Sequence, residues 1–127
     1  MNVPDEFRYT KEHEWVRFDE DAGEVTIGIT DFAQSELGDI VFLELPDTGE
    51  EFGAGDVLGT IEAVKTVADI YAPVSGEVIA VNEHLEDSPE SVNEEPYDEG
   101  WILRMSVAEP DELDSLLNAE AYKELVE

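Results

Sequence analysis

The sequence predicts a mainly β fold, a sandwich or barrel of two similar halves with short helices at its periphery and C-terminus. Short runs rich in β-branched residues, separated by turn residues, recur throughout the first 107 positions. Residues 38–43 (GDIVFL) weakly resemble residues 76–81 (GEVIAV), which predicts a two-fold arrangement with the joining segment between the halves. Beyond Pro110 the apolar residues change to helical spacing.

The expected strands are bounded by residues that favour turns. They comprise residues 15–18, 24–29, 40–45, 57–64, 66–72, 77–81 and 101–107. The sequence DEDAG at 19–23 makes a hairpin of the first two strands, and PVSG at 73–76 turns the chain into the sixth. A polar stretch, residues 82–100, precedes the last strand.

Helices are expected in three places. Thr30 or Asp31 can cap a short helix that runs to Leu37, where Gly38 is placed to end it. The segment opened by Pro110 has acidic residues in its first turn and leucines at helical spacing. Asn118 can cap a second short C-terminal helix. We interpret the apolar faces of both C-terminal segments as core packing.

The length of 127 residues suits one domain with a modest core. We therefore expect residues 1–127 to form a single domain, with residues 110–127 as a helical extension packed on it. No apolar run approaches the ~20 residues that cross a membrane, and the N-terminus lacks the layout of a secretory signal. Cysteine is absent, which excludes disulfides and thiolate chemistry. We expect a cytoplasmic protein.

Acidic residues dominate the charge: 34 Asp and Glu against 6 Lys and Arg give a net charge of −28. They are spread along the whole chain, so the entire surface repels nucleic acid and anionic lipid. Salt near 1 M shortens the screening length to about 3 Å and relieves the self-repulsion. The composition is typical of a protein from a halophile.

A catalytic or metal site has little support in the sequence. His13 and His84 are far apart, and we interpret each as a surface or capping residue. Carboxylates lie near any histidine by chance in so acidic a chain, so they do not indicate a metal triad. The glycines at 49, 53 and 55 lie in a turn-rich connection and not in a phosphate-binding loop.

Lys65 is the one residue that stands out chemically. The chain has three lysines, and this one separates two expected strands, in the position of a hairpin tip. An amine there projects on a flexible stem and is accessible to an acylating enzyme, and acylation would remove its charge. The alternative is an ordinary solubilising lysine paired with Glu62 or Asp69.

Residues 61–76 (IEAVKTVADIYAPVSG) resemble the lipoyl-attachment hairpin of the biotinyl/lipoyl carrier fold. The match narrows to the glycine cleavage H-protein family and covers nearly the whole chain in order. The further matching segments are YTKEHEWV at 9–16, IGITDFAQ at 27–34, LGDIVF at 37–42, NEEPY at 93–97, GW at 100–101, DEL at 111–113 and AY at 121–122. Two departures flank the lysine: Ala63 replaces a common serine and Thr66 a common alanine.

The resemblance implies a barrel-sandwich hybrid of two quasi-symmetric halves and a monomeric, non-catalytic carrier with lipoate on Lys65. The arm would shuttle the aminomethyl group of glycine. Its partners would be a pyridoxal-phosphate glycine decarboxylase, a tetrahydrofolate-dependent aminomethyltransferase, an FAD-dependent dihydrolipoamide dehydrogenase and a lipoate-attaching enzyme. By the same resemblance Glu62 assists recognition by the attaching enzyme. Glu14 and Asp69 line the cleft that receives the loaded arm, and Glu12 lies beside them.

Four other functions remain open from the residues alone. A biotin carrier has the same fold but usually flanks its lysine with methionines, where this chain has Val64 and Thr66. A lipoyl domain of a 2-oxoacid dehydrogenase would lack the His-Glu-Trp segment and the C-terminal helices. A cofactor-free acidic interaction protein would leave Lys65 unmodified, and a hydrolase would need a constellation that the sequence does not indicate.

Overall fold

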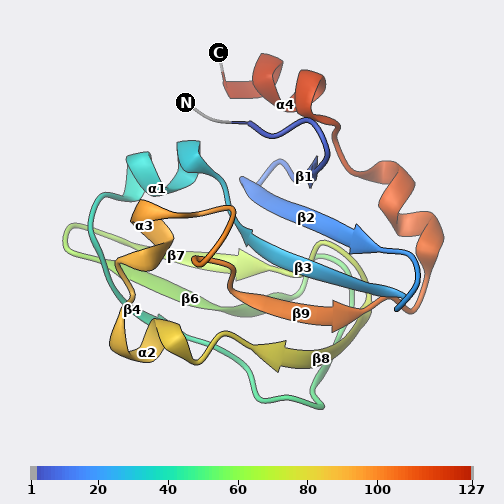
Figure 1. Cartoon of the computed structure of the whole chain (residues 1–127), viewed down its shortest axis with the longest axis horizontal. Helices are drawn as coiled ribbons and strands as arrows, with labels where there is room; N and C mark the ends of the chain where they lie inside the picture. Colours follow the sequence, from blue (N-terminus) through green and yellow to red (C-terminus); the bar gives the residue numbers. More distant parts are fainter. Residues whose placement is uncertain (1–2, 127) are drawn as a thin grey trace.

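Two antiparallel β-sheets form the molecule, as the computed structural model of residues 3–126 shows (Figure 1). The larger sheet contains, in spatial order, β1 (Arg8–Tyr9), β2 (Glu14–Asp19), β3 (Glu24–Ile29), β9 (Leu103–Ser106), β8 (Gly76–Val81) and β5 (Glu51–Phe52). The smaller sheet contains β4 (Ile40–Glu44), β6 (Val57–Ala63) and β7 (Val67–Tyr71). The predicted mainly β architecture is confirmed. The two segments of the internal echo form β4 and β8, one in each sheet.

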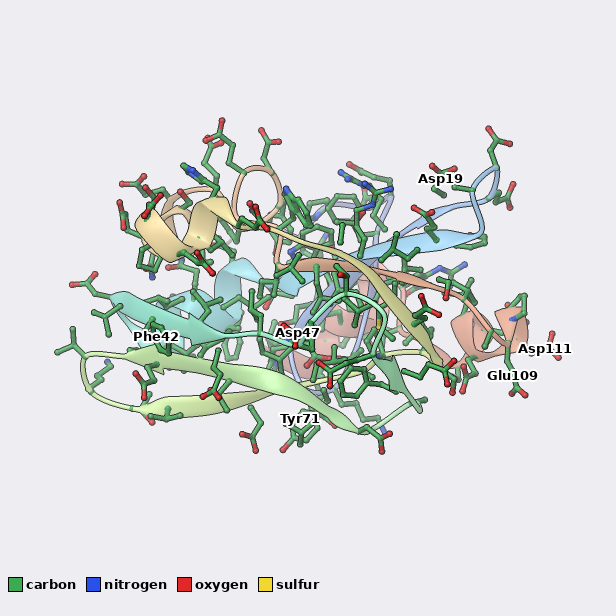
Figure 2. All side chains as sticks on the ribbon, turned by 90° about the horizontal axis from the view of Figure 1, so that it is seen from below. Asp19, Phe42, Asp47, Tyr71, Glu109 and Asp111 are labelled. Atoms are coloured by element: carbon green, nitrogen blue, oxygen red, sulfur yellow. The ribbon has the colours of Figure 1, made fainter. Side chains whose placement is uncertain are left out.

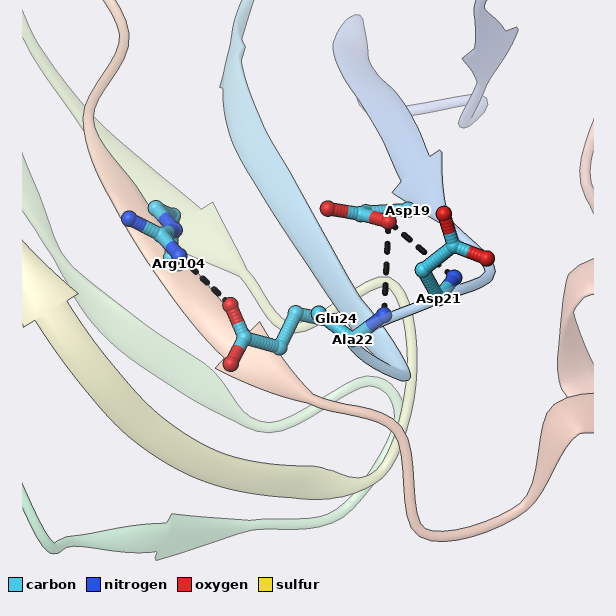
Figure 3. A network of polar contacts seen from close by, with 5 residues as sticks. All are labelled: Asp19, Asp21, Ala22, Glu24 and Arg104. Carbon is cyan, nitrogen blue, oxygen red and sulfur yellow. Dashed lines mark hydrogen bonds and ion pairs between the residues drawn. The ribbon is translucent and has the colours of Figure 1, made fainter.

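The predicted first hairpin pairs β2 with β3 over six residue pairs. Its turn is closed by the Asp19 side chain, which accepts hydrogen bonds from the backbone N–H groups of Asp21 (3.1 Å) and Ala22 (3.3 Å) (Figure 3). On the neighbouring strand β9, Arg104 forms an ion pair of 2.6 Å with Glu24. Local side-chain bonds of this kind fix the turn and therefore the register of the sheet.

Helix α1 (Asp31–Leu37) begins and ends as the sequence predicts. The Thr30 hydroxyl accepts a hydrogen bond from the Ala33 N–H at 3.1 Å, and Gly38 terminates the helix with φ of +81°. The polar stretch holds two short helices that the sequence did not indicate, α2 (His84–Asp87) and α3 (Ser91–Glu94). Each is a single turn, too short to produce a periodic apolar pattern.

The two C-terminal segments differ in type. The first, Pro110–Ser115, is a 3-10 helix, whereas the second, α4 (Ala119–Val126), is an α-helix. The Asn118 side chain accepts a hydrogen bond from the Ala121 N–H at 2.8 Å, which confirms the predicted cap. Between these helices Leu117 exchanges two backbone hydrogen bonds of 2.8 Å with Tyr9, so the C-terminal segment is attached to β1.

Two clusters of buried side chains stabilise this arrangement. The larger one fills the space between the sheets with Val, Ile, Leu and Met side chains from β2, β3, β4, β6, β7, β8 and β9. The smaller one is aromatic and joins α4 to the N-terminal region: the rings of Tyr9 and Tyr122 stack at 4.7 Å, and those of Phe7 and Trp15 at 4.9 Å. The Trp15 indole N–H donates to the Pro96 carbonyl at 2.7 Å, which satisfies the one polar atom of that ring.

Acidic side chains are spread over the view of the fold in Figure 2, in which Asp19, Asp47 and Asp111 are labelled. Within residues 3–126 the ion pairs are Arg104–Glu24 and Lys123–Asp5 (3.8 Å). No helix in the described part of the chain is long and apolar enough to span a membrane.

Candidate functional site

Lys65 lies at the tip of the β6–β7 hairpin, as predicted. The tip is closed by a backbone hydrogen bond from the Ala63 N–H to the Thr66 carbonyl (2.8 Å) and is held to the start of β4 by one from Val64 to Asp39 (3.0 Å). Lys65 is exposed and forms no ion pair with any residue from 3 to 126. The ion pair with Glu62 or Asp69 that the alternative interpretation included is therefore absent among these residues.

The Lys65 side chain passes over the C-terminal end of α1. A Cβ atom placed on Gly38 would lie 3.2 Å from Lys65 Cε and 3.7 Å from its Nζ, so the glycine leaves space for the lysine stem. Leu37, the residue before Gly38, lines a cleft that continues along α1. Lys65 therefore lies next to one end of this cleft.

The cleft has a volume of about 240 Å³ and lies between α1, the β1–β2 turn with the start of β2, the end of β3, and strands β6 and β7. Its apolar lining comes from Ile29, Phe32, Ala33, Leu37, Ile61 and Ala68, and its polar lining from Glu12, His13, Glu14, Glu36 and Asp69. The structure thus brings together the three predicted docking acids, Glu12, Glu14 and Asp69. A second hollow of about 460 Å³ adjoins it, because Glu12 and Glu14 line both. Another hollow of that size, at residues 43–48 and 81–86, does not include any of the predicted residues.

Glu14 is the most unusual carboxyl group in the cleft because only 2% of its surface is exposed. Its Oε2 accepts a hydrogen bond of 2.6 Å from the Tyr71 N–H, and its Oε1 accepts one of 3.2 Å from the Thr10 hydroxyl. Burial outweighs these bonds and raises the pKa of Glu14 from its ordinary value of 4.5 to about 8. A cation that enters the cleft would favour the carboxylate form.

Glu62 lies outside the cleft, on the exposed face of the smaller sheet. Its cross-strand neighbours are Phe42 on β4 and Val67 on β7, whose exposed fractions are 51% and 60%. Val64, beside Lys65, is 74% exposed. The acid three residues before the lysine is thus surrounded by apolar side chains that are accessible from outside.

His13 belongs to the cleft, although from the sequence we interpreted it as a surface or capping residue. Its backbone is left-handed, with φ of +69°, which is uncommon for a residue other than glycine. Its ring lies 4.9 Å from that of Phe32, and its Nδ1 is 2.9 Å from the Tyr122 hydroxyl. Burial lowers the pKa of His13. In the sequence, the only sign that His13 lines the cleft was its position next to Glu14.

Residues 7–127 match the model of the family described as Glycine cleavage H-protein. The chain belongs to the glycine cleavage H-protein family. It is 52% identical over 126 residues to the glycine cleavage system H protein of Staphylococcus epidermidis, which is 99% of this chain and 98% of that protein. It is 58% identical over 125 residues to that of Chromohalobacter salexigens, 98% of this chain and 95% of that protein.

A crystal structure of a glycine cleavage system H protein from Mycobacterium marinum has the same fold, with a TM-score of 0.89. The two chains are 36% identical, and the match covers 96% of this one and 97% of the other. The predicted carrier fold is therefore confirmed.

Glycine cleavage H proteins carry lipoate on a lysine and are non-catalytic subunits of the glycine cleavage system. This chain is accordingly a lipoyl carrier that serves the decarboxylase, the aminomethyltransferase and the dihydrolipoamide dehydrogenase. The attached group supplies a reversible dithiol that carries the one-carbon amine derived from glycine. The fit is good, because an accessible lysine with no ion pair to residues 3–126 adjoins a largely apolar cleft.

Proposed function

We propose that Lys65 is the lysine that carries lipoate, and that the cleft beside α1 receives the loaded arm. The observation that carries this proposal is the continuity between the two: the Lys65 stem lies over Gly38, and the adjacent Leu37 lines the cleft. The other lysines lack this setting. Lys123 lies on α4 and pairs with Asp5 at 3.8 Å, and Lys11 lies in the turn between β1 and β2.

Glu62 is proposed to guide the lipoate-attaching enzyme to Lys65. Its carboxylate is exposed between Phe42 and Val67, on the same sheet face as the hairpin tip. Such a patch suits a partner that combines an apolar surface with a basic side chain. High salt would weaken the charge contact and leave the apolar contacts to provide most of the affinity.

Glu14, Asp69 and Glu12 are proposed to dock the protonated amine of the loaded arm. Glu14 is buried at the cleft wall, while Asp69 and Glu12 are exposed at its margin. A charge-assisted contact to the carboxylate form of Glu14 would contribute about 1.5–3 kcal/mol, less the cost of removing the proton that burial favours on this group. The two exposed acids would contribute less, because water and salt screen them.

The working environment is proposed to be a salty cytoplasm. A net charge of −28 on 127 residues disfavours the compact state unless salt screens it. We also propose that residues 1–127 act as a single carrier domain, with residues 110–127 packed on it through the contacts of Leu117 and Tyr122.

Peptide mass spectrometry tests the attachment site. The chain is incubated with lipoate and a lipoate-attaching enzyme, beside the variants Lys65→Arg and Glu62→Gln. We expect a lipoyl adduct on Lys65 alone, none on Lys65→Arg, and slower modification of Glu62→Gln. A lipoyl adduct on Lys11 or Lys123, or an adduct of biotin mass from the native host, would refute the assignment.

A further inference from the structure

The hydroxyl group of Tyr122 links two parts of the chain that form the cleft. Tyr122 lies on α4 and is fully buried. Its oxygen is 2.9 Å from Nδ1 of His13 and 2.7 Å from Oγ1 of Thr30. The hydroxyl donates its single proton to one of these neighbours and accepts a hydrogen bond from the other. One buried group therefore bonds to both.

The two neighbours belong to two segments of the chain that supply the cleft lining, the β1–β2 turn and α1 with its N-cap. His13 lines the wall that also contains Glu12 and Glu14. Thr30 is the N-cap of α1, and its Oγ1 accepts the Ala33 N–H at 3.1 Å. The residues that form the α1 wall, Phe32, Ala33, Glu36 and Leu37, all follow this cap. Thr30 thus lies at the start of the helix that supplies this second wall.

The His13 side needs such support because its conformation is not one that the residue adopts freely. A φ of +69° costs free energy for a residue with a Cβ, and surrounding contacts must maintain it. The contacts present are the His13 N–H to the Thr10 carbonyl (3.2 Å), the Thr30 N–H to the His13 carbonyl (3.0 Å), the ring of Phe32, and the Tyr122 hydroxyl. The hydrogen bond to the His13 ring comes from Tyr122, on the C-terminal helix.

We propose that Tyr122 is a positioning residue, whose hydroxyl holds the His13 wall and the α1 wall at the separation that retains the loaded arm. The C-terminal helix is thereby part of the carrier function, since it supplies the group that ties the cleft. This inference rests on the proposed docking of the arm in the cleft. It assigns Tyr122 no contact with the cargo.

The stacked pair Tyr9 and Tyr122 provides a matched control. Both rings are fully buried and lie 4.7 Å apart, and each hydroxyl is hydrogen-bonded. The Tyr9 hydroxyl donates to the Pro4 carbonyl at 2.6 Å, away from the cleft. Tyr122→Phe and Tyr9→Phe therefore remove the same atom from the same aromatic stack. Only Tyr122→Phe removes the tie, meaning the hydroxyl that bonds to both His13 and Thr30.

The first measurement is amide hydrogen exchange on the unlipoylated full-length variants in high salt. In Tyr122→Phe the amides of Thr30 and Ala33 should exchange about 2- to 10-fold faster, as the loss of one buried hydrogen bond allows. In Tyr9→Phe they should match the parent. Equal exchange in the two variants would overturn the proposed tie.

The second measurement is the lifetime of the loaded arm on lipoylated protein, compared among the parent, Glu14→Gln, Tyr122→Phe and Tyr9→Phe. We expect Glu14→Gln and Tyr122→Phe to shorten the lifetime and Tyr9→Phe to leave it unchanged. If Glu14→Gln has no effect, the docking proposal itself fails. If Glu14→Gln shortens the lifetime while Tyr122→Phe matches Tyr9→Phe, only the function of Tyr122 is refuted.

A variant of His13, the hydrogen-bond partner of Tyr122, tests the tie independently if Tyr122→Phe fails to fold. His13→Asn retains a residue that tolerates the left-handed backbone and removes the bond to Tyr122. It should reproduce the faster exchange at Thr30 with a thermal midpoint close to that of the parent. Parent-like exchange at Thr30 in His13→Asn would contradict the tie.

Discussion

The buried carboxyl group of Glu14 should make this carrier less stable as the pH rises. Because the folded pKa is about 8 and the ordinary value is 4.5, the folded chain holds a proton that the unfolded chain releases. The stabilising effect of that proton is complete below the unfolded pKa. It is lost progressively as the pH rises to the folded pKa, where the buried group must ionise. The variant Glu14→Gln keeps the shape and an acceptor for the Tyr71 N–H but cannot ionise.

The magnitude follows from the shift in pKa. A difference of about 3.5 units corresponds to about 5 kcal/mol of unfolding free energy in total, at about 1.4 kcal/mol per pH unit. Between about pH 5.5 and about pH 9 the parent should therefore lose about 3 kcal/mol relative to Glu14→Gln. Water screens this carboxyl group little, since Glu14 is only 2% exposed.

Urea unfolding of the unlipoylated parent and of Glu14→Gln, at a series of pH values in about 1 M KCl, measures this difference. The two proteins share every other acidic residue, so the difference between their stability profiles reports on Glu14. A stability difference that stays constant between pH 5.5 and 9 would show that Glu14 is already ionised in the folded protein. The explanation based on burial would then be wrong.

Two further predictions concern the fold itself. Gly76→Ala should lower the unfolding free energy by about 1–3 kcal/mol in a denaturant titration, because its Cβ would overlap the Ser106 carbonyl oxygen, whereas Gly23→Asn, with φ of +68° and open space, should cost less. An equal loss in both variants would contradict the steric reasoning. The thermal midpoint of the parent should rise between about 0.1 M and about 1 M KCl, because the screening length falls from about 10 Å to about 3 Å around a charge of −28. A midpoint independent of salt would show that self-repulsion does not limit its stability.

Local sequence patterns were sufficient to predict the elements that depend on residues close to one another in the chain. The β2–β3 hairpin depends on turn residues within five positions, and α1 on Thr30 and Gly38 at its own ends. Lys65 was predicted at a hairpin tip because strand-forming runs flank it on both sides. Features without a local signature were missed: the two-residue strands β1 and β5, the single turns α2 and α3, and the 3-10 geometry after Pro110.

The tertiary structure determined the surroundings of the 34 acidic residues. The resemblance to a known family selected Glu14, but only the fold buries its carboxyl group and raises its pKa. The contact between His13 and Tyr122 joins residues 109 positions apart, and the sequence suggested neither residue for the cleft. Such contacts are invisible in the sequence because they depend on how sheets and helices pack, whereas charge, turns and caps act between neighbours along the chain.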